Sequence, residues 1–248
     1  MHIGKLFKKL PAKYYSHKFK NLSLDSRKCK KNDIFFSIKG VKKNGNKFIS
    51  DAIKNGAKTI VSDLNFQGKK KNILFIKNNN VRKLVSEIAS KFYNEIPKNL
   101  VAITGTNGKS SIASFYHQIL RNKKLNVASI GTLGIKINSS NKLTYNTTLD
   151  PISVHKNLSL MKRKKITNTI LEASSHGLKQ NRLDGLKFDI SIFTNLSRDH
   201  LDYHKTYKDY FNSKLILFKK LTKRGGTIIY DNDISYSKIL NKICIDKK

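Results

Sequence analysis

The order of apolar and polar residues along the chain predicts short strands that alternate with amphipathic helices. Apolar residues spaced three or four apart, such as Val81, Val85 and Ile88, are typical of one helix face, whereas short apolar runs are typical of buried strands. By these patterns we expect strands at 34–40, 57–63, 73–76, 100–104, 126–131, 167–174, 187–195 and 225–233. We expect helices at 45–56, 81–94, 112–120, 151–165 and 207–221, the third with Ile112, Phe115, Ile119 and Leu120 as its apolar stripe.

Strands that alternate with helices indicate an α/β protein whose sheets are mostly parallel and carry helices on both faces. Pro97, in the segment 95–99, interrupts the pattern, and we place a domain boundary there. We therefore expect a small N-terminal α/β domain at 1–97 and a mostly parallel-sheet domain at 98–248. With 248 residues the chain is long enough to bury two such cores.

The charge of the chain is unusual, with 50 Lys and Arg residues against 16 Asp and Glu residues and a formal net charge of +34. Such an excess is compatible with nucleic acid or another anionic partner. The lysines are scattered in short groups without interleaved aromatic residues, so we interpret the excess mainly as composition and expect nucleic acid not to be the main partner. An anionic small substrate fits either interpretation.

The sequence gives no indication of secretion or membrane insertion. The first 20 residues contain charges but no continuous apolar segment, and no stretch approaches the roughly 20 apolar residues that a spanning helix needs. Cys29 and Cys244 are far apart and match no metal or redox spacing, which is typical of a reducing compartment. We therefore expect a cytoplasmic protein without membrane insertion, and we expect a monomer.

The stretch VAITGTNGKSS, residues 101–111, has the outline of a phosphate-binding loop. An apolar strand leads into a turn with two glycines, followed by a lysine and two serines at the start of a helix. Backbone amides of such a turn bind phosphates together with the helix N-terminus, while the lysine contacts the outer phosphates and the hydroxyl faces Mg²⁺. The first glycine comes late, because the common loop has glycine where this chain has Ile103. The expected ATP-binding residues are Gly105, Thr106, Asn107, Gly108, Lys109, Ser110 and Ser111.

Two further predicted strands end in polar residues that fit the same site. One ends at Glu172, and the other leads into Asp199, His200, Asp202 and His204. Because ligands bind at the carboxyl ends of parallel strands, we expect these side chains to lie near the phosphate loop. Histidines four residues apart suggest zinc when taken alone, but oxygen donors beside a phosphate loop favour Mg²⁺ or Mn²⁺.

Four segments resemble the Mur ligase family: TGTNGKSS (104–111), NTT (146–148), EASSHGLKQNR (172–182) and FTNLSRDHLDYH (193–204). The likeness covers nearly the whole chain, and the late first glycine is normal in that family. The segment LDSRKCKKNDIFFSIKG (24–40) is similar to the first domain of one branch of the family. That branch adds the third amino acid to UDP-N-acetylmuramoyl-L-alanyl-D-glutamate in peptidoglycan synthesis.

The resemblance implies ATP-dependent amide bond formation in the bacterial cytoplasm. A substrate carboxylate attacks the γ-phosphate of ATP to give an acyl phosphate and ADP, and an amine then displaces phosphate. Positioning and charge neutralisation would supply most of the catalysis. The implied partners are ATP, the UDP-N-acetylmuramoyl-dipeptide and an amino acid, with meso-diaminopimelate preferred over lysine, and the implied metal cofactor is Mg²⁺.

The resemblance also implies roles for individual residues. Lys109, Glu172, His200 and Lys214 would be catalytic, and Ser110, Glu172, His200 and Lys214 would be metal ligands. Lys214 falls where the family has a carbamylated lysine, whose carbamate supplies an anionic oxygen. For residues 41–43 the side chains depart from the family, so only a backbone role carries over. The implied contacts to the UDP-linked substrate are Leu24, Ser26, Val41, Lys42, Lys43, Asn146, Thr147, Thr148, Ser174, Gln180 and Arg182.

Two alternatives stay open. The first is another ligase of the same superfamily, of the folylpolyglutamate synthase or cyanophycin type, against which the segments 24–27 and 172–182 argue. The second is a basic nucleic-acid-binding P-loop module, which salt-dependent binding to duplex DNA would favour. In the family a C-terminal domain follows the central one, so we expect 98–248 to be an incomplete central domain that binds its ligands without forming the amide.

Overall fold

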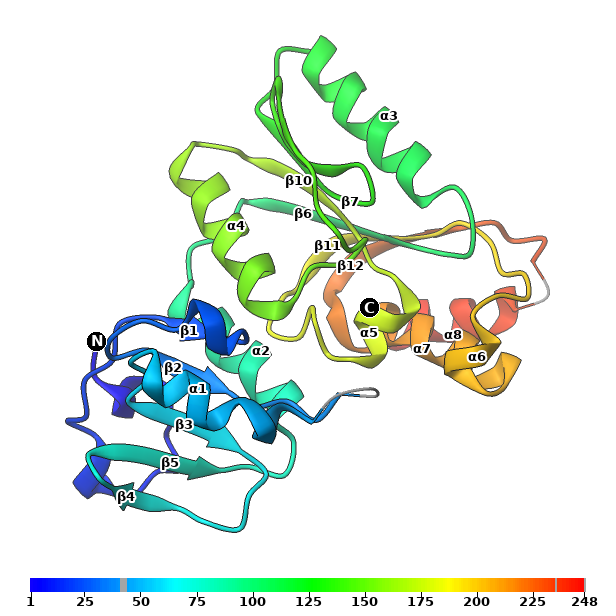
Figure 1. Ribbon diagram of the computed structural model, residues 1–248. Helices are drawn as coiled ribbons and strands as arrows, with labels where there is room; N and C mark the ends of the chain where they lie inside the picture. The colour runs from blue at the N-terminus through cyan, green and yellow to red at the C-terminus, as the bar shows by residue number, and fades with distance from the viewer. Residues whose placement is uncertain (41–43, 235, 248) are drawn as a thin grey trace. The chain divides into compact units, whose positions relative to one another are not determined.

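The computed structural model describes residues 1–40, 44–234 and 236–247 (Figure 1). The chain forms two compact units, Met1–Phe92 and Tyr93–Lys248. The division falls shortly before Pro97, because Ile96 already packs against the core of the second unit. Among the described residues, no helix is long and apolar enough to cross a membrane.

The first unit contains a five-stranded sheet in the order β1-β2-β3-β5-β4. The described pairs are parallel except for β4 with β5, which is antiparallel. On α2, Val85, Ile88 and Ala89 are buried, as the helical spacing predicts. The elements are β1 (Leu22–Ser23), β2 (Ile34–Phe36), α1 (Ile49–Lys54), β3 (Thr59–Ser62), β4 (Gly68–Lys70), β5 (Ile73–Lys77) and α2 (Val81–Phe92), with short 3-10 helices at Ile3–Lys5, Ala12–Tyr14, Ser26–Lys28 and Gly45–Phe48.

The second unit contains a seven-stranded sheet in the order β12-β11-β6-β10-β7-β8-β9. Its first five strands in that order pair in parallel, and β8 and β9 continue the sheet in antiparallel pairs. The strands are β6 (Asn99–Thr104), β7 (Val127–Gly131), β8 (Gly134–Ile137), β9 (Ser140–Lys142), β10 (Asn168–Glu172), β11 (Phe188–Phe193) and β12 (Thr222–Tyr230). The helices are α3 (Lys109–Asn122), α4 (Pro151–Arg163), α5 (Ser175–Lys179), α6 (Leu201–His204), α7 (Tyr207–Ile216) and α8 (Ser237–Lys247), with a π-helical turn at Leu217–Leu221.

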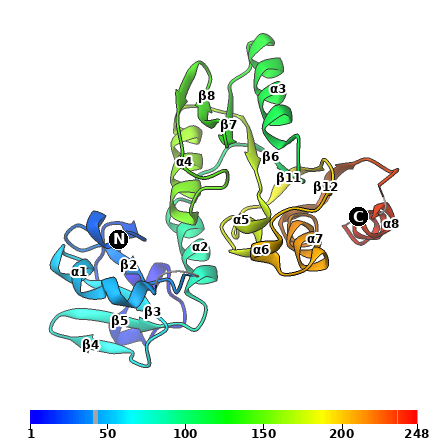
Figure 2. The ribbon, with the colours of Figure 1, turned by 45° about the vertical axis from the view of Figure 1, so that its right-hand side comes forward.

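Helices cover both faces of the second sheet. Successive residues of a strand point to opposite faces, so one strand contributes apolar side chains to both. Val101 and Ile103 of β6 pack with Ala113 of α3, whereas Leu100 and Ala102 belong to the larger core that includes α4. Figure 2 shows the sheet between these two helices. The predicted α/β class with mostly parallel sheets is confirmed.

The predicted helix is present as α3, but its apolar stripe is not the buried face. Phe115 and Ile119 are 59% and 55% exposed, and the buried positions of this helix are Ala113 and His117. Ile112 contributes only partly buried surface to the core under α3. The small residue of this helix, Ala113, therefore meets the sheet. Helical spacing alone does not distinguish a face that packs on a sheet from an apolar face that stays exposed.

Candidate active site

The candidate active site lies where β6, β10 and β11 end at the carboxyl edge of the parallel sheet. β6 is the middle strand of the three, with β10 on one side and β11 on the other. The chain builds the β10 side of the sheet first and the β11 side afterwards. Such a reversal of strand order opens a crevice at the carboxyl edge, and the phosphate loop leaves β6 at this point.

The phosphate loop turns sharply between Thr104 of β6 and Lys109, the first residue of α3. Gly105 and Gly108 have φ angles of +148° and +82°, a region that favours glycine. A Cβ atom on Gly105 would lie 1.8 Å from Oγ1 of Thr194, which follows β11. The position of the first glycine is therefore set by the close approach of the neighbouring strand.

A pocket of about 260 Å³ is lined by the loop after β6, by residues at the ends of β7 and β10, and by His200 from the segment that follows β11. It contains all four residues expected to be catalytic, together with all seven residues expected to bind ATP. It also contains residues that no pattern in the sequence singled out, among them Thr132 and Tyr210. The lining residues are Gly105, Thr106, Asn107, Gly108, Lys109, Ser110, Ser111, Thr132, Thr147, Glu172, Ser174, Ser175, His200, Tyr210 and Lys214.

The Glu172 carboxylate is 2% exposed and accepts hydrogen bonds from neutral donors. Ser110 Oγ lies 2.9 Å from its Oε2, while the amide and hydroxyl of Thr132 lie 2.9 Å and 3.2 Å from Oε1 and Oε2. Gly131 makes room for this arrangement, because a Cβ there would lie 2.0 Å from Oε1. No ion pair to Glu172 is found within the described residues, so a buried negative charge beside the phosphate loop fits a bound cation.

The protein side chains alone do not enclose a metal ion. Within the described part of the chain, no three His, Cys, Asp or Glu side chains cluster closely enough to hold one. An Mg²⁺ ion that uses Ser110 and Glu172 would take its remaining ligands from phosphate oxygens and water, as is usual for this ion. The donor set therefore fits Mg²⁺ bound together with a nucleotide.

Two lysines converge on the carbonyl oxygen of Gly105. Lys109 Nζ lies 2.9 Å from the Gly105 oxygen and 2.7 Å from the backbone carbonyl oxygen of Thr106. Lys214 Nζ lies 2.7 Å from the same Gly105 oxygen. Lys214, on α7, is 1% exposed and lies 4.3 Å from the centre of the Tyr210 ring. Burial lowers the pKa of Lys214 to about 7, with a further contribution from Lys109, and burial also lowers the pKa of Lys109.

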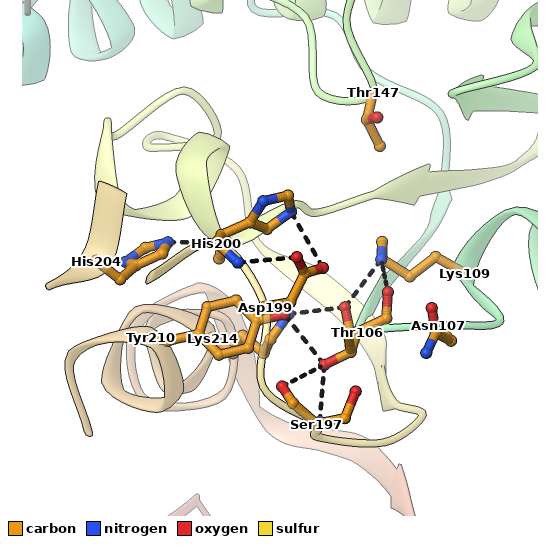
Figure 3. A network of polar contacts seen from close by, with 12 residues as sticks. Thr106, Asn107, Lys109, Thr147, Ser197, Asp199, His200, His204, Tyr210 and Lys214 are labelled. Carbon is orange, nitrogen blue, oxygen red and sulfur yellow. Dashed lines mark hydrogen bonds and ion pairs between the residues drawn. The ribbon is translucent and has the colours of Figure 1, made fainter. Parts of the chain in front are cut away.

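The loop amides do not all face the pocket. The Thr106 amide donates to the Asn195 carbonyl oxygen at 3.0 Å, and the Asn107 amide donates to Asn195 Oδ1 at 2.9 Å. The Thr106 hydroxyl in turn contacts Tyr210 Oη at 3.1 Å (Figure 3). These two amides therefore already have partners, whereas the first amides of α3 have no partner within the helix.

The two histidines that follow β11 have different surroundings. His200 lines the pocket, and its Nε2 lies 3.5 Å from the Asp199 carboxylate. His204 is fully buried, and its Nε2 lies 3.0 Å from Ser175 Oγ. Burial lowers the pKa of His204 to about 4. His200 is therefore available to a ligand in the pocket, whereas His204 is a neutral internal residue.

The residues expected to contact the peptide part of the substrate lie in two groups. The Thr148 hydroxyl lies 3.0 Å from Ser174 Oγ. Arg182 donates from Nη1 to the backbone carbonyl oxygen of Thr148 at 2.6 Å and from Nη2 to Gln180 Oε1 at 2.8 Å. The second group is Thr147, whose hydroxyl lies 2.9 Å from that of Thr132.

The remaining expected substrate contacts are Asn146, Leu24, Ser26 and residues 41–43. Asn146, next to Thr147, is exposed. Leu24 and Ser26 belong to the first unit, where Ser26 is buried and its carbonyl accepts from Asn55 Nδ2 at 3.0 Å. Val41, Lys42 and Lys43 lie outside the described residues.

Sequence reasoning missed Thr132, Tyr210 and the pair Thr194–Asn195. Thr132 follows β7 directly, so the rule that ligands bind at strand ends could have found it. Asn195 stands inside a segment already quoted for its similarity to a family, but nothing in the residue pattern indicates that it contacts the phosphate loop. Tyr210 is 1% exposed and reads in the sequence as an ordinary core residue of a helix.

Comparison with known proteins agrees with this geometry. The family model described as Mur ligase family, catalytic domain matches residues 18–97, and the model described as Mur ligase middle domain matches residues 103–248. A curated relative from Clostridium tetani, named UDP-N-acetylmuramoyl-L-alanyl-D-glutamate–2,6-diaminopimelate ligase, is 42% identical over 204 residues, covering 80% of this chain and 42% of that protein. The chain spans about half the length of the curated relatives it matches.

Two solved structures show the same fold. A structure of UDP-N-acetylmuramoyl-L-alanyl-D-glutamate–2,6-diaminopimelate ligase matches 99% of this chain and 50% of that chain with a TM-score of 0.83 and 28% identity. A MurF ligase from Thermotoga maritima in complex with ADP matches 92% of this chain and 48% of that chain with a TM-score of 0.63 and 18% identity. The middle-domain model covers more than half of the described chain and agrees with the fold and the phosphate loop. The chain therefore belongs to the Mur ligase family.

Proposed function

We propose that the chain forms the substrate- and ATP-binding part of a ligase that adds meso-diaminopimelate to UDP-N-acetylmuramoyl-L-alanyl-D-glutamate. The observation that carries the proposal is the pocket in which the phosphate loop, Lys109 and the buried Glu172 meet at three strand ends. The name of the relative from Clostridium tetani supports this substrate and this amino acid. The product would be a peptidoglycan precursor.

In this proposal the residues of the loop bind and orient ATP. The amides at the start of α3 hold phosphate oxygens, and Lys109 leaves the carbonyls of Gly105 and Thr106 to contact the outer phosphates. Ser110 and Glu172, with His200 as a further ligand, would hold Mg²⁺, which when bound would neutralise phosphate charge. The substrate carboxylate, oriented beside the γ-phosphate, then forms the acyl phosphate, and the amine of the diaminopimelate displaces phosphate from it.

We also propose that Lys214 is carbamylated in the active ligase. Carbon dioxide reacts with a neutral amine, and burial lowers the pKa of Lys214 to about 7, so a large fraction of the amine is neutral near that pH. The carbamate would replace a cation with an anion in the pocket that also contains Glu172 and His200. An additional anionic oxygen at this position suits a second Mg²⁺.

The expected substrate contacts belong to two sets of residues. Thr147, Thr148, Ser174, Gln180 and Arg182 would contact the muramoyl-peptide, and Arg182 suits a carboxylate because its planar fork binds two oxygens. To do so, Arg182 would exchange its bonds to Thr148 and Gln180 for bonds to the substrate. Asn146 would join this group. Leu24 and Ser26, with the backbone of residues 41–43, would contact the UDP end.

The amino acid and the reaction class are tested by competition. A complete ligase that contains this chain is supplied with ATP, Mg²⁺, the UDP-N-acetylmuramoyl-dipeptide and equal amounts of meso-diaminopimelate and lysine, and the product is identified by mass. We expect the diaminopimelate tripeptide and one ADP per product. A lysine product would overturn the choice of amino acid, and ATP hydrolysis that does not depend on the UDP-dipeptide would overturn the ligase assignment.

A further inference from the structure

Two residues at the end of β11, Thr194 and Asn195, hold the phosphate loop at Thr106 and Asn107. Asn195 Oδ1 accepts from the backbone amide of Asn107 at 2.9 Å, and Asn195 Nδ2 donates to the backbone carbonyl oxygen of Asn107 at 3.3 Å. Thr194 Oγ1 donates to the same oxygen at 2.6 Å. The Asn195 carbonyl accepts from the Thr106 amide at 3.0 Å. Four hydrogen bonds thus join two residues of one strand end to two residues of the loop.

This clamp, Thr194 and Asn195, is fixed to the same strand that feeds the loop. Phe193 is the register partner of Thr104, and the Thr194 amide donates to the Thr104 oxygen at 3.0 Å. Gly105 lies between them, where a Cβ would meet Thr194 Oγ1 at 1.8 Å. The loop can therefore approach the clamp only because residue 105 is glycine, and the contact continues the β6–β11 pairing beyond the strands.

The clamp determines which backbone groups of the loop face the pocket. With the Thr106 and Asn107 amides bound to Asn195, the turn that follows presents Gly108 and the first amides of α3 to the crevice. A loop without these bonds would exchange among several turn conformations, and ATP binding would carry the entropic cost of ordering it. The backbone amides of Thr106 and Asn107 therefore have hydrogen-bond partners within the protein before ATP binds.

We propose that Asn195, assisted by Thr194, is a positioning residue that holds the phosphate loop ready for ATP. The inference rests on the proposed function, because it assumes that the loop binds ATP. Asparagine suits this position because one side chain both accepts from an amide and donates to a carbonyl. Aspartate would accept only, and it would bring a negative charge close to the phosphates.

The test compares Asn195→Ala, Asn195→Asp and Thr194→Val with the wild-type chain. Ser197→Ala is the matched control, because Ser197 bonds to Thr106 through its backbone amide at 3.0 Å and its backbone oxygen at 3.3 Å. Four quantities are measured: hydrogen exchange of the Asn107 amide, ATP affinity, affinity for the UDP-N-acetylmuramoyl-dipeptide, and melting temperature.

For Asn195→Ala we expect faster exchange of the Asn107 amide and an ATP affinity lower by roughly three- to tenfold, the range for a lost hydrogen bond. Affinity for the UDP-dipeptide and the melting temperature should stay close to wild type. Asn195→Asp should keep the Asn107 amide protected yet weaken ATP binding, most strongly at low salt. Ser197→Ala should match the wild type in every quantity.

An ATP affinity of Asn195→Ala within twofold of wild type would overturn the positioning role. If Asn195→Ala does not fold, Asn195→Asp and Thr194→Val decide, and unchanged ATP affinity in both would again overturn it. Failure of the wild-type chain itself to bind ATP would contradict the proposed function, so the two failures are distinguishable.

Discussion

His155 on α4 should make the second unit sensitive to acid. The imidazole is 1% exposed and its Nε2 lies 3.2 Å from the Asp184 carbonyl oxygen, while Nδ1 is buried without a hydrogen-bond partner. Burial lowers the pKa of His155 from its ordinary value of 6.5 to about 4, although the bond to Asp184 opposes the shift. The folded state therefore favours the neutral ring.

The sign of the pH dependence follows from proton binding. Between about pH 6.5 and pH 4 the unfolded chain binds a proton at His155 that the folded chain does not, so the free energy of unfolding falls as the pH falls. One pH unit corresponds to about 1.36 kcal/mol, so His155 should remove roughly 2 to 3 kcal/mol of stability between pH 7.5 and pH 4.5. Nearly full burial makes solvent screening small.

The perturbation is His155→Gln, which keeps a donor for the Asp184 oxygen but has no ring to protonate. Urea unfolding of the second unit is followed from pH 7.5 to pH 4.5 in both chains, and the difference between them isolates His155 from other titrating groups. His155→Leu, which lacks the donor, separates the hydrogen bond from the titration. NMR of the His155 ring protons should give a midpoint near pH 4. A stability difference that stays constant with pH, or a midpoint near 6.5, would refute the reasoning.

Two further predictions concern the pocket. Gly131→Ala would place a Cβ 2.0 Å from Glu172 Oε1, so we expect the Mg²⁺-dependent part of ATP affinity to fall by about tenfold or more. Calorimetry with and without Mg²⁺ measures this change. An unchanged dependence of ATP affinity on Mg²⁺ would contradict the role of Glu172. Lys214→Ala should abolish amide formation by the ligase, and added short carboxylates that replace the carbamate should restore part of it. Full activity without added carboxylate would show that Lys214 is dispensable.

Strong local signals made much of the second unit predictable. The apolar runs that became β6, β7, β10 and β11 are buried strands, and Lys109 with Ser110 marked the start of α3. Most of the helices and strands that the sequence did not predict have weak sequence patterns. The β8–β9 hairpin is short and mostly polar, and α5 has only five residues, so neither spacing nor composition distinguished them from loops. The helix α8 was also missed, although its buried residues Leu240 and Ile243 have the spacing of one helix face.

The candidate site was predictable as a set of strand ends but not as a set of contacts. Glu172 and His200 line the pocket with the loop because parallel strands end at one edge. The bonds of Asn195 to the loop depend on tertiary packing between residues 88 positions apart along the chain. The same holds for the exposed Phe115 on α3, since helical spacing cannot indicate which apolar residue meets the sheet.

ATP binding at the phosphate loop is the central claim, and calorimetry on the chain with Mg²⁺ and ATP tests it most directly. Lys109→Ala removes a charge-assisted contact to the outer phosphates, and Lys123→Ala, at the other end of α3, is the control for loss of one positive charge. We expect the wild type and Lys123→Ala to bind ATP equally, and Lys109→Ala to bind about tenfold to a hundredfold more weakly. Equal ATP affinity in Lys109→Ala and the wild type would contradict the account.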